Sequence, residues 1–561
     1  MNQENRKGKI HPGKPYKALK GILCLILFLS GMEIARADPY PLNNCIEIRH
    51  YAFELILSDK TNEIQGKARI IIRQINVENQ KILLDLIQKT EERKGKGMVV
   101  DSVWVRDKKL QTRLDANHIQ IILEKPLKQG EEITLQVQYH GIPIEGLIIG
   151  NTKYGKRSFF SDNWPNKARN WLPTFDHPYY KSTSEFIIKA PIHYQVISNG
   201  LLKEETHLDS TTKLTHWRQD VPVSCWLFDL GVADFAVQYY DSFQNKVIST
   251  WVFPENKKEG FYDFSDATKK SVQFFSDYIG PYVYEKIANV QTASVAGGME
   301  ASSAIFYAEN LVTGKRSQRI RNVVIHELAH QWFGNSVTEK NWDHVWLSEG
   351  FATFFTLLFI ENEYGKEEFR KGLIQSRNTI YQTTIKQPGF KIIDHRDPEK
   401  EEVTSAITYQ KGAWTLHMLR NLLGEESFKK GIQEYYRTYM NGHADTQDFQ
   451  SIMEKTSGKK LGPFLDQWLN HAENPELTGN WTYDSLKKTV KIHLEQSQEG
   501  NYIFQLPIEM GIKQGNQAIK MVKLNLNSKT LDQEIPMKNK PEKIIFDPRL
   551  VLLAQIKGNF E

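Results

Sequence analysis

The sequence predicts a multidomain α+β protein, with a β-rich N-terminal part, a helix-rich middle and a second β-rich part. Two stretches of alternating residues and the helical spacing between them predict this order. Apolar residues occupy every second position over 133–139 and again over 502–512, which is typical of half-buried strands. The chain has 561 residues, 40% of them hydrophobic, and this length suggests three or four domains.

Residues 1–37 are expected to be a secretory signal peptide. A lysine-rich stretch precedes an apolar run from Gly21 to Gly31, and Ala35-Arg36-Ala37 then offers a small-x-small cleavage pattern. A spanning helix needs about 20 apolar residues, so this run is short for one. We therefore expect a periplasmic or secreted protein with no stable membrane span after cleavage. An uncleaved N-terminal membrane anchor is the alternative.

The charge of the remaining chain gives no support for a nucleic-acid partner. The whole sequence has a formal charge of +5, but residues 1–37 contain seven basic and two acidic side chains. Without them, 65 basic and 65 acidic residues remain. A nucleic-acid-binding protein would be expected to carry a basic surplus. Cleavage would also leave two cysteines, Cys45 and Cys225, and the sequence leaves open whether they pair.

Changes in residue pattern suggest domain boundaries. Residues 38–235 are expected to form a mainly antiparallel β domain. Residues 236–475 contain predicted helices over 319–333, 348–364 and 406–423, the last with Gly424 as a plausible C-cap. Alternation returns after Pro475, and residues 476–561 are expected to form a small β-sandwich domain.

The helix predicted over 319–333 contains the motif for a metal site. His326 and His330 are four residues apart, so both imidazoles lie on one helical face and can bind the same ion. Glu349, at the start of the next predicted helix, can return to this ion as a third ligand. Two histidines and one carboxylate favour a zinc ion, one per chain, with a fourth position open for water.

This ligand set predicts peptide-bond hydrolysis. Zinc lowers the pKa of a bound water and polarises the scissile carbonyl, and Glu327 lies next to the first ligand as the expected general base. Two alternatives remain open at this point. One is a zinc endopeptidase, and the other is a catalytically inactive peptide-binding protein on the same fold.

Several separate motifs resemble the aminopeptidase N family of zinc metallopeptidases. The segments are HELAHQWFGN at 326–335, WLSEGFAT at 346–353 and the eighteen residues between His330 and Glu349. The resemblance implies a thermolysin-like α/β catalytic domain and removal of single amino acids from peptides with a free N-terminus. It also implies a form without the large C-terminal helical domain that many relatives carry. One branch of the family adds an epoxide hydrolase activity.

The resemblance also implies roles for two further segments. The family's exopeptidase motif corresponds to Gly297, Gly298, Met299 and Glu300, with Ala301 in place of the usual asparagine. In the family this glutamate binds the substrate's α-amine, as a carboxylate pairs with an ammonium group. Tyr409 matches the catalytic tyrosine that donates a hydrogen bond to the oxyanion.

A third similar segment, residues 168–178, raises a question about amine recognition. Five residues before Arg169 the family often has a glutamate or glutamine as a second amine ligand, but this chain has Trp164 there. Asp162 or Asn163 is a possible replacement, and the absence of any replacement is the third possibility.

Overall fold

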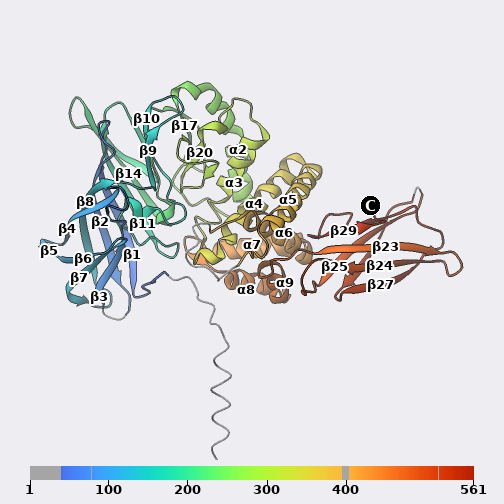
Figure 1. Cartoon of the computed structure of the whole chain (residues 1–561). Coiled ribbons are helices and arrows are strands. Elements are labelled where there is room, and N and C mark those ends of the chain that lie inside the picture. The colour runs from blue at the N-terminus through green and yellow to red at the C-terminus, as the bar shows by residue number, and fades with distance from the viewer. Residues whose placement is uncertain (1–39, 77–78, 394–402, 516) are drawn as a thin grey trace, which may run out of the picture.

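The computed structural model describes residues 40–76, 79–393, 403–515 and 517–561, so the predicted signal peptide lies outside the described residues. The protein is a multidomain α+β structure. β-Sheets of the N-terminal half lie at one end, the helices lie in the centre, and the C-terminal strands lie at the other end (Figure 1). Within the described residues, no helix is both long and apolar enough to cross a membrane.

An eight-stranded sheet dominates the N-terminal half, with the strand order β13-β14-β11-β1-β2-β8-β4-β5. Its neighbours pair antiparallel except for β1 and β11, which are parallel. The buried residues alternate along β8, as the sequence predicted for 133–139. The strands of this sheet are β1 (Ile46–Ile56), β2 (Ile64–Gln74), β4 (Gly97–Val105), β5 (Lys108–Lys109), β8 (Glu132–Ile142), β11 (Lys181–Pro191), β13 (Leu201–His207) and β14 (Thr212–Ser224).

Two smaller sheets complete this half. One has the order β3-β7-β6 and the other β12-β15-β10-β9. Their strands are β3 (Asn79–Asp85), β6 (Gln111–Leu114), β7 (His118–Leu127), β9 (Leu147–Asn151), β10 (Arg157–Ser161), β12 (Gln195–Ser198) and β15 (Leu230–Ala233). Cys45 and Cys225 are free thiols, so no disulfide joins them.

The middle of the chain joins a five-stranded sheet to a group of helices. The sheet order is β16-β17-β18-β20-β19, with β17, β18 and β20 parallel and the short strand β19 at one edge. The strands are β16 (Ala236–Phe243), β17 (Lys246–Val252), β18 (Ile287–Thr292), β19 (Gly298–Met299) and β20 (Ala304–Ala308). The helices are α2 (Lys257–Tyr278), α3 (Gln318–Ala329), α4 (Trp346–Tyr364), α5 (Lys366–Lys386), α6 (Ala406–Leu423), α7 (Glu425–Tyr439), α8 (Thr446–Ser457) and α9 (Gly462–Leu469).

Three of these helices were predicted from sequence. Helix α6 has the predicted bounds, and Gly424 ends it with a φ of 85°, a conformation that glycine adopts without strain. Helix α4 begins two residues earlier than expected, and α3 ends at Ala329 rather than at residue 333. The chain leaves the helix after Ala329, and Trp332 and Phe333 in the following turn are both fully buried.

Helix α4 is buried over most of its surface, because neighbouring helices cover it. Helices α3, α5 and α6 all pack against α4. Its contact with α6 is unusually close at a pair of glycines, since a Cβ added to Gly350 would lie 3.0 Å from the Cα of Gly412. A side chain at either glycine would push the two helices slightly apart. The close contact brings the first turn of α6 beside the first turn of α4.

The described residues after Pro475 form strands, turns and loops, in two sheets with the orders β27-β24-β23-β29 and β26-β25-β28. Strand β25 begins at Leu506, so Tyr502 and Phe504 precede it, although alternation had suggested one continuous strand from residue 502. The strands are β23 (Glu476–Asp484), β24 (Thr489–Gln496), β25 (Leu506–Lys513), β26 (Lys520–Leu526), β27 (Thr530–Pro536), β28 (Lys543–Phe546) and β29 (Gln555–Gly558). The domain boundaries given above stay predictions.

Candidate metal centre and substrate cavity

The last turn of α3 and the first turn of α4 bring three metal-ligating side chains together. The Nε2 atoms of His326 and His330 lie 3.1 Å apart. Oε2 of Glu349 lies 3.5 Å from the first nitrogen and 3.3 Å from the second. With zinc–ligand distances of about 2.0–2.1 Å, a tetrahedral site separates its ligand atoms by roughly 3.3 Å. The three predicted ligands therefore fit one tetrahedral zinc ion.

Neighbouring groups orient two of these ligands. Nδ1 of His330 lies 3.1 Å from the carbonyl oxygen of Phe333 and 3.0 Å from the hydroxyl of Ser348. A proton that Nδ1 donates to this carbonyl leaves Nε2 free to bind a metal. On the other side, the Tyr409 hydroxyl donates to Oε1 of Glu349 at 2.9 Å. The second oxygen of Glu349 is then left to face the two imidazoles.

The electrostatics of the centre favour a charged Glu349. Burial alone would raise the pKa of Glu349, but the nearby His330 and His326 imidazoles lower it to about 2. Burial lowers the pKa of His326, which favours the neutral imidazole that a metal requires. Burial and the nearby Glu300 carboxylate raise the pKa of Glu327 well above its usual range.

Glu300 lies on the side of the centre next to His330. Oxygen or nitrogen atoms of Glu300, Glu327 and His330 all lie within 4.8 Å of one another. Oε1 of Glu300 is buried, and no described residue offers it a hydrogen bond. A buried carboxylate oxygen without a partner is costly unless a ligand completes it. An ammonium group would complete it.

The position of Glu300 depends on side chains that directly follow the metal ligand His330. The amide groups of Gln331 and Asn335 both donate to the carbonyl oxygen of Glu300, at 2.9 and 2.6 Å. The Oε1 atom of Gln331 also accepts a hydrogen bond from the backbone N–H of Ser303. Two amides on the metal-binding segment thus fix the distance between Glu300 and the metal ligands.

The glycines before Glu300 allow a close approach to the predicted general base. A Cβ added to Gly298 would lie 2.1 Å from Oε1 of Glu327, so a side chain at this position would displace the Glu327 carboxylate. Gly297, Gly298, Met299 and Glu300 all line the same cavity as the three metal ligands, with Glu327 and Tyr409. This cavity has a volume of about 1250 Å³. The structure therefore brings together every site residue predicted from the sequence.

The structure separates the two possible replacements for the second amine ligand. Asn163 is buried, donates to the Phe228 carbonyl and accepts from the Trp171 indole, so its side chain is already engaged. Asp162 instead lines the cavity, and Nζ of Lys167 lies 3.8 Å from it. Of the two, Asp162 is therefore the one available to a ligand.

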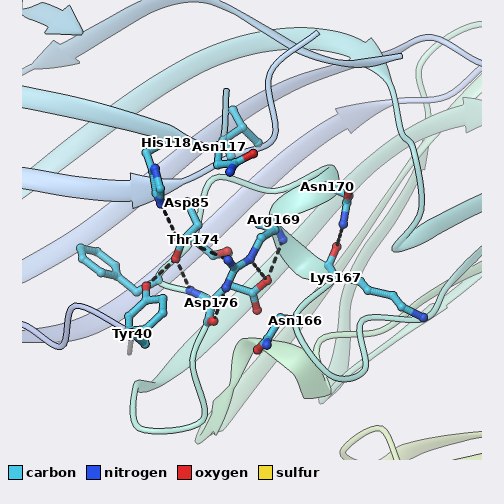
Figure 2. Close-up of polar contacts among 12 residues, drawn as sticks. Tyr40, Asp85, Asn117, His118, Asn166, Lys167, Arg169, Asn170, Thr174 and Asp176 are labelled. Atoms are coloured by element: carbon cyan, nitrogen blue, oxygen red, sulfur yellow. Dashed lines mark hydrogen bonds and ion pairs between the residues drawn. The ribbon is translucent and has the colours of Figure 1, made fainter. Parts of the chain in front are cut away.

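The similar segment at 168–178 contributes no residue to the lining of this cavity, and the contacts described for it are structural. Figure 2 shows Arg169 directed toward Asp176, and its Nε donates to Oδ2 of Asp176 at 2.9 Å. Asp85 accepts hydrogen bonds from the Tyr40 hydroxyl at 2.5 Å and the Asp176 backbone N–H at 2.8 Å. These buried contacts hold together the N-terminal stretch, strand β3 and the loop that follows Trp164.

Sequence reasoning missed the contributions of Gln331, Asn335 and Ser348. They lie within the two motifs at 326–335 and 346–353, so their closeness to the predicted metal ligands in the sequence could have indicated a role at the site. Their hydrogen-bond partners, however, come from distant segments, and the spacing of residues along the chain does not identify such partners.

Comparison with known proteins identifies the family. Residues 47–227 match the Peptidase M1 N-terminal domain, and residues 264–468 match the Peptidase family M1 domain. Together these matches cover more than half of the chain. The chain belongs to peptidase family M1. This is the aminopeptidase N family that the motifs predicted, and zinc, the metal this family uses, fits the three ligands.

Two curated relatives illustrate the similarity. The chain is 31% identical to glutamyl aminopeptidase from Sus scrofa over 329 residues, which cover 56% of this chain and 35% of the relative. It is 26% identical to probable aminopeptidase 1 from Saccharolobus solfataricus over 502 residues, which cover 85% and 62%. The chain thus spans less than two thirds of the length of each of these relatives.

A solved structure supports the same fold. It is that of a mutant M1 zinc metallopeptidase from Deinococcus radiodurans, with a TM-score of 0.64 and 22% sequence identity. The match covers 76% of this chain and 94% of that one.

The hydrogen bond between Ser348 and His330 leads to a prediction about zinc affinity. We expect Ser348→Ala to weaken zinc binding by about tenfold, because loss of a partner that orients a ligand typically costs 10–100-fold. Competition with a chelating dye would measure the affinity. Thr356→Ala, on the same helix, is the matched control. Equal zinc affinity of Ser348→Ala and the unaltered protein would contradict the orienting role.

Proposed function

We propose that this chain is a zinc-dependent aminopeptidase that hydrolyses the first peptide bond of peptides with a free N-terminus. The position of Glu300 carries the proposal, because its carboxylate lies within 4.8 Å of His330 and no described residue offers its buried Oε1 a hydrogen bond. An ammonium group bound there places the first peptide bond, and no later one, at the metal centre. Membership of family M1 and the names of the relatives support the same activity.

His326, His330 and Glu349 would hold the zinc ion of a thermolysin-like catalytic domain. When bound, the ion supplies Lewis acidity that polarises the scissile carbonyl and lowers the pKa of water. Glu327 takes a proton from the attacking water at its carboxylate and passes it to the leaving nitrogen. The Tyr409 hydroxyl, which donates to Glu349 in this structure, can turn toward the developing oxyanion.

Asp162 is proposed as the second ligand of the substrate's amine. It lines the same cavity as Glu300, and its negative charge contributes to raising the pKa of Glu300, which burial raises most, to about 7. Two acidic groups around one ammonium ion favour a charged N-terminus over an acetylated one. Trp164, at the position where the family often has a glutamate or glutamine, also lines this cavity.

An assay with free and blocked substrates tests the activity. We expect the mature, zinc-loaded chain to hydrolyse amino-acid 4-nitroanilides and short peptides, and to leave their Nα-acetylated forms intact. A zinc chelator should abolish the hydrolysis. Comparable cleavage of acetylated peptides would instead support a zinc endopeptidase. Failure to cleave any substrate, with zinc bound, would support an inactive peptide-binding protein.

The hydrogen bond from Asn335 to the Glu300 carbonyl predicts a specific kinetic effect. Asn335→Ala should raise KM for free-amine substrates by about tenfold, with a smaller change in kcat. The reason is that the substitution loosens Glu300, the proposed amine ligand, which binds the substrate away from the reacting atoms. Asn421→Ala, which removes a side-chain amide hydrogen bond to the His417 carbonyl on the exposed side of α6, is the control. A change confined to kcat, or loss of bound zinc, would contradict this role.

Export is the localisation that the N-terminal sequence supports. We propose cleavage after Ala37, giving a periplasmic or secreted protein that begins at Asp38, because a basic stretch, an apolar run and a small-x-small site occur in order. The intact mass of the protein isolated from its native host would show the loss of residues 1–37. A mass that includes them would favour the N-terminal membrane anchor instead.

A further inference from the structure

A lysine of the N-terminal half reaches the chain segment that binds the metal. Lys181 is the first residue of β11, in the eight-stranded sheet, and it is partly buried. Its Nζ donates to the carbonyl oxygens of Asn335 and Ser336, at 2.9 and 2.7 Å. These two residues follow the metal ligand His330 in the same segment. One ammonium group therefore holds two successive carbonyls close to the metal centre.

The two carbonyls belong to residues that water does not reach. Asn335 and Ser336 are both fully buried. The Asn335 carbonyl also accepts a hydrogen bond from the Thr338 hydroxyl, at 3.0 Å. Within the described residues, however, Lys181 is the only donor to the Ser336 carbonyl. A buried carbonyl without a donor is costly, so loss of the lysine would favour a shift of this segment.

Asn335 transmits such a shift to the proposed amine ligand. Its backbone carbonyl is held by Lys181, while its side-chain amide donates to the Glu300 carbonyl at 2.6 Å. The path from the N-terminal half to Glu300 thus consists of one residue and two hydrogen bonds. Because Glu300 carries the buried Oε1 that no described residue satisfies, its exact position decides how well an ammonium group is bound.

A buried carboxyl group next to Lys181 must be considered with it. Glu339 is fully buried on the short strand β21 (Thr338–Glu339), and no described residue offers either carboxylate oxygen a hydrogen bond. Burial lowers the pKa of Lys181 to about 7, and the nearby Glu339 carboxylate opposes this effect. Removal of the lysine alone would therefore leave a buried acidic group without its neighbouring cation.

We propose that Lys181 is a positioning residue for recognition of the substrate's amine, because it fixes Asn335 and, through Asn335, the distance of Glu300 from the metal ligands. The inference rests on the proposed aminopeptidase function, in which Glu300 binds that amine. Lys181 is not among the residues that line the substrate cavity, so it acts through Asn335. Its loss should weaken recognition of the amine and leave the metal ligands in place.

A pair of hydroxamates isolates recognition of the amine. Leucine hydroxamate and 4-methylpentanohydroxamate share the metal-binding group and the side chain, but only the first carries an α-ammonium group. Calorimetry on the zinc-loaded protein gives the Kd of each compound in the absence of turnover. The ratio of the two affinities therefore measures the contribution of the amine alone.

The unaltered protein should bind leucine hydroxamate at least about tenfold more tightly than the des-amino compound. Lys181→Met, which keeps the length of the side chain and removes the donor, should abolish most of this preference. The affinity for the des-amino compound should stay within about twofold. The double variant Lys181→Met/Glu339→Gln should show the same low preference. Because it removes both charged groups, it tests the proposal even where the single variant is destabilised.

Two further variants serve as controls. Lys189→Met replaces another partly buried lysine, near the other end of β11, and should keep the full preference for the amine. Glu339→Gln alone should keep it as well. An unchanged preference in Lys181→Met would overturn the proposal. A preference restored in the double variant would also overturn it, since Lys181 would then act only as a counter-charge to Glu339.

The unaltered protein separates this proposal from the proposed function. If it binds the two hydroxamates equally, Glu300 does not bind the amine, and both proposals are overturned. If it prefers leucine hydroxamate and Lys181→Met keeps that preference, the role of Lys181 is overturned and the aminopeptidase function stands.

Discussion

The contact between α3 and α4 is the constraint on which the rest of the site depends. It brings Nε2 of two histidines and one carboxylate oxygen to separations of 3.1–3.5 Å, the spacing of a tetrahedral metal site. Burying a carboxylate beside two imidazoles costs desolvation free energy, and a bound cation offsets this cost. The surrounding packing, with α4 buried among its neighbours, holds the ligands in place before the metal binds.

Two further contacts extend this constraint to Tyr409 and Glu300, the side chains proposed to face the substrate. The close approach of Gly350 and Gly412 places Tyr409 against Glu349. On the other side, Gln331 and Asn335 connect the metal-binding segment to Glu300. Each contact ties a substrate-facing group to the chain segment of a metal ligand. The positions of Glu300 and Tyr409 relative to the metal ligands are therefore set by short, direct connections.

The N-terminal half contributes to the site by hydrogen bonding to Ser302 and Ser303, which follow Glu300. Lys286 is buried and donates to the carbonyls of Ser198 and Gly200 and to the hydroxyl of Ser303. Asn199 donates to the Ser302 carbonyl at 2.8 Å. Buried polar groups of this kind find their hydrogen-bond partners only when the N-terminal half is packed correctly against the middle of the chain. The position of Glu300 thus depends on how the N-terminal half packs against the middle of the chain.

The sequence by itself predicted the metal ligands, the general base and the helices that carry them. For His326 and His330 the reason is that spacing along a helix decides which side chains share a face. It also indicated the order of β-rich and helical parts. Tertiary structure decided what depends on distant segments: that Asn163 is engaged while Asp162 faces the cavity, that Tyr409 contacts Glu349, and that Lys181 reaches the metal-binding segment. The physical reason is that hydrogen-bond partners and cavities arise from packing between elements, whereas local periodicity reports only which face of an element is buried.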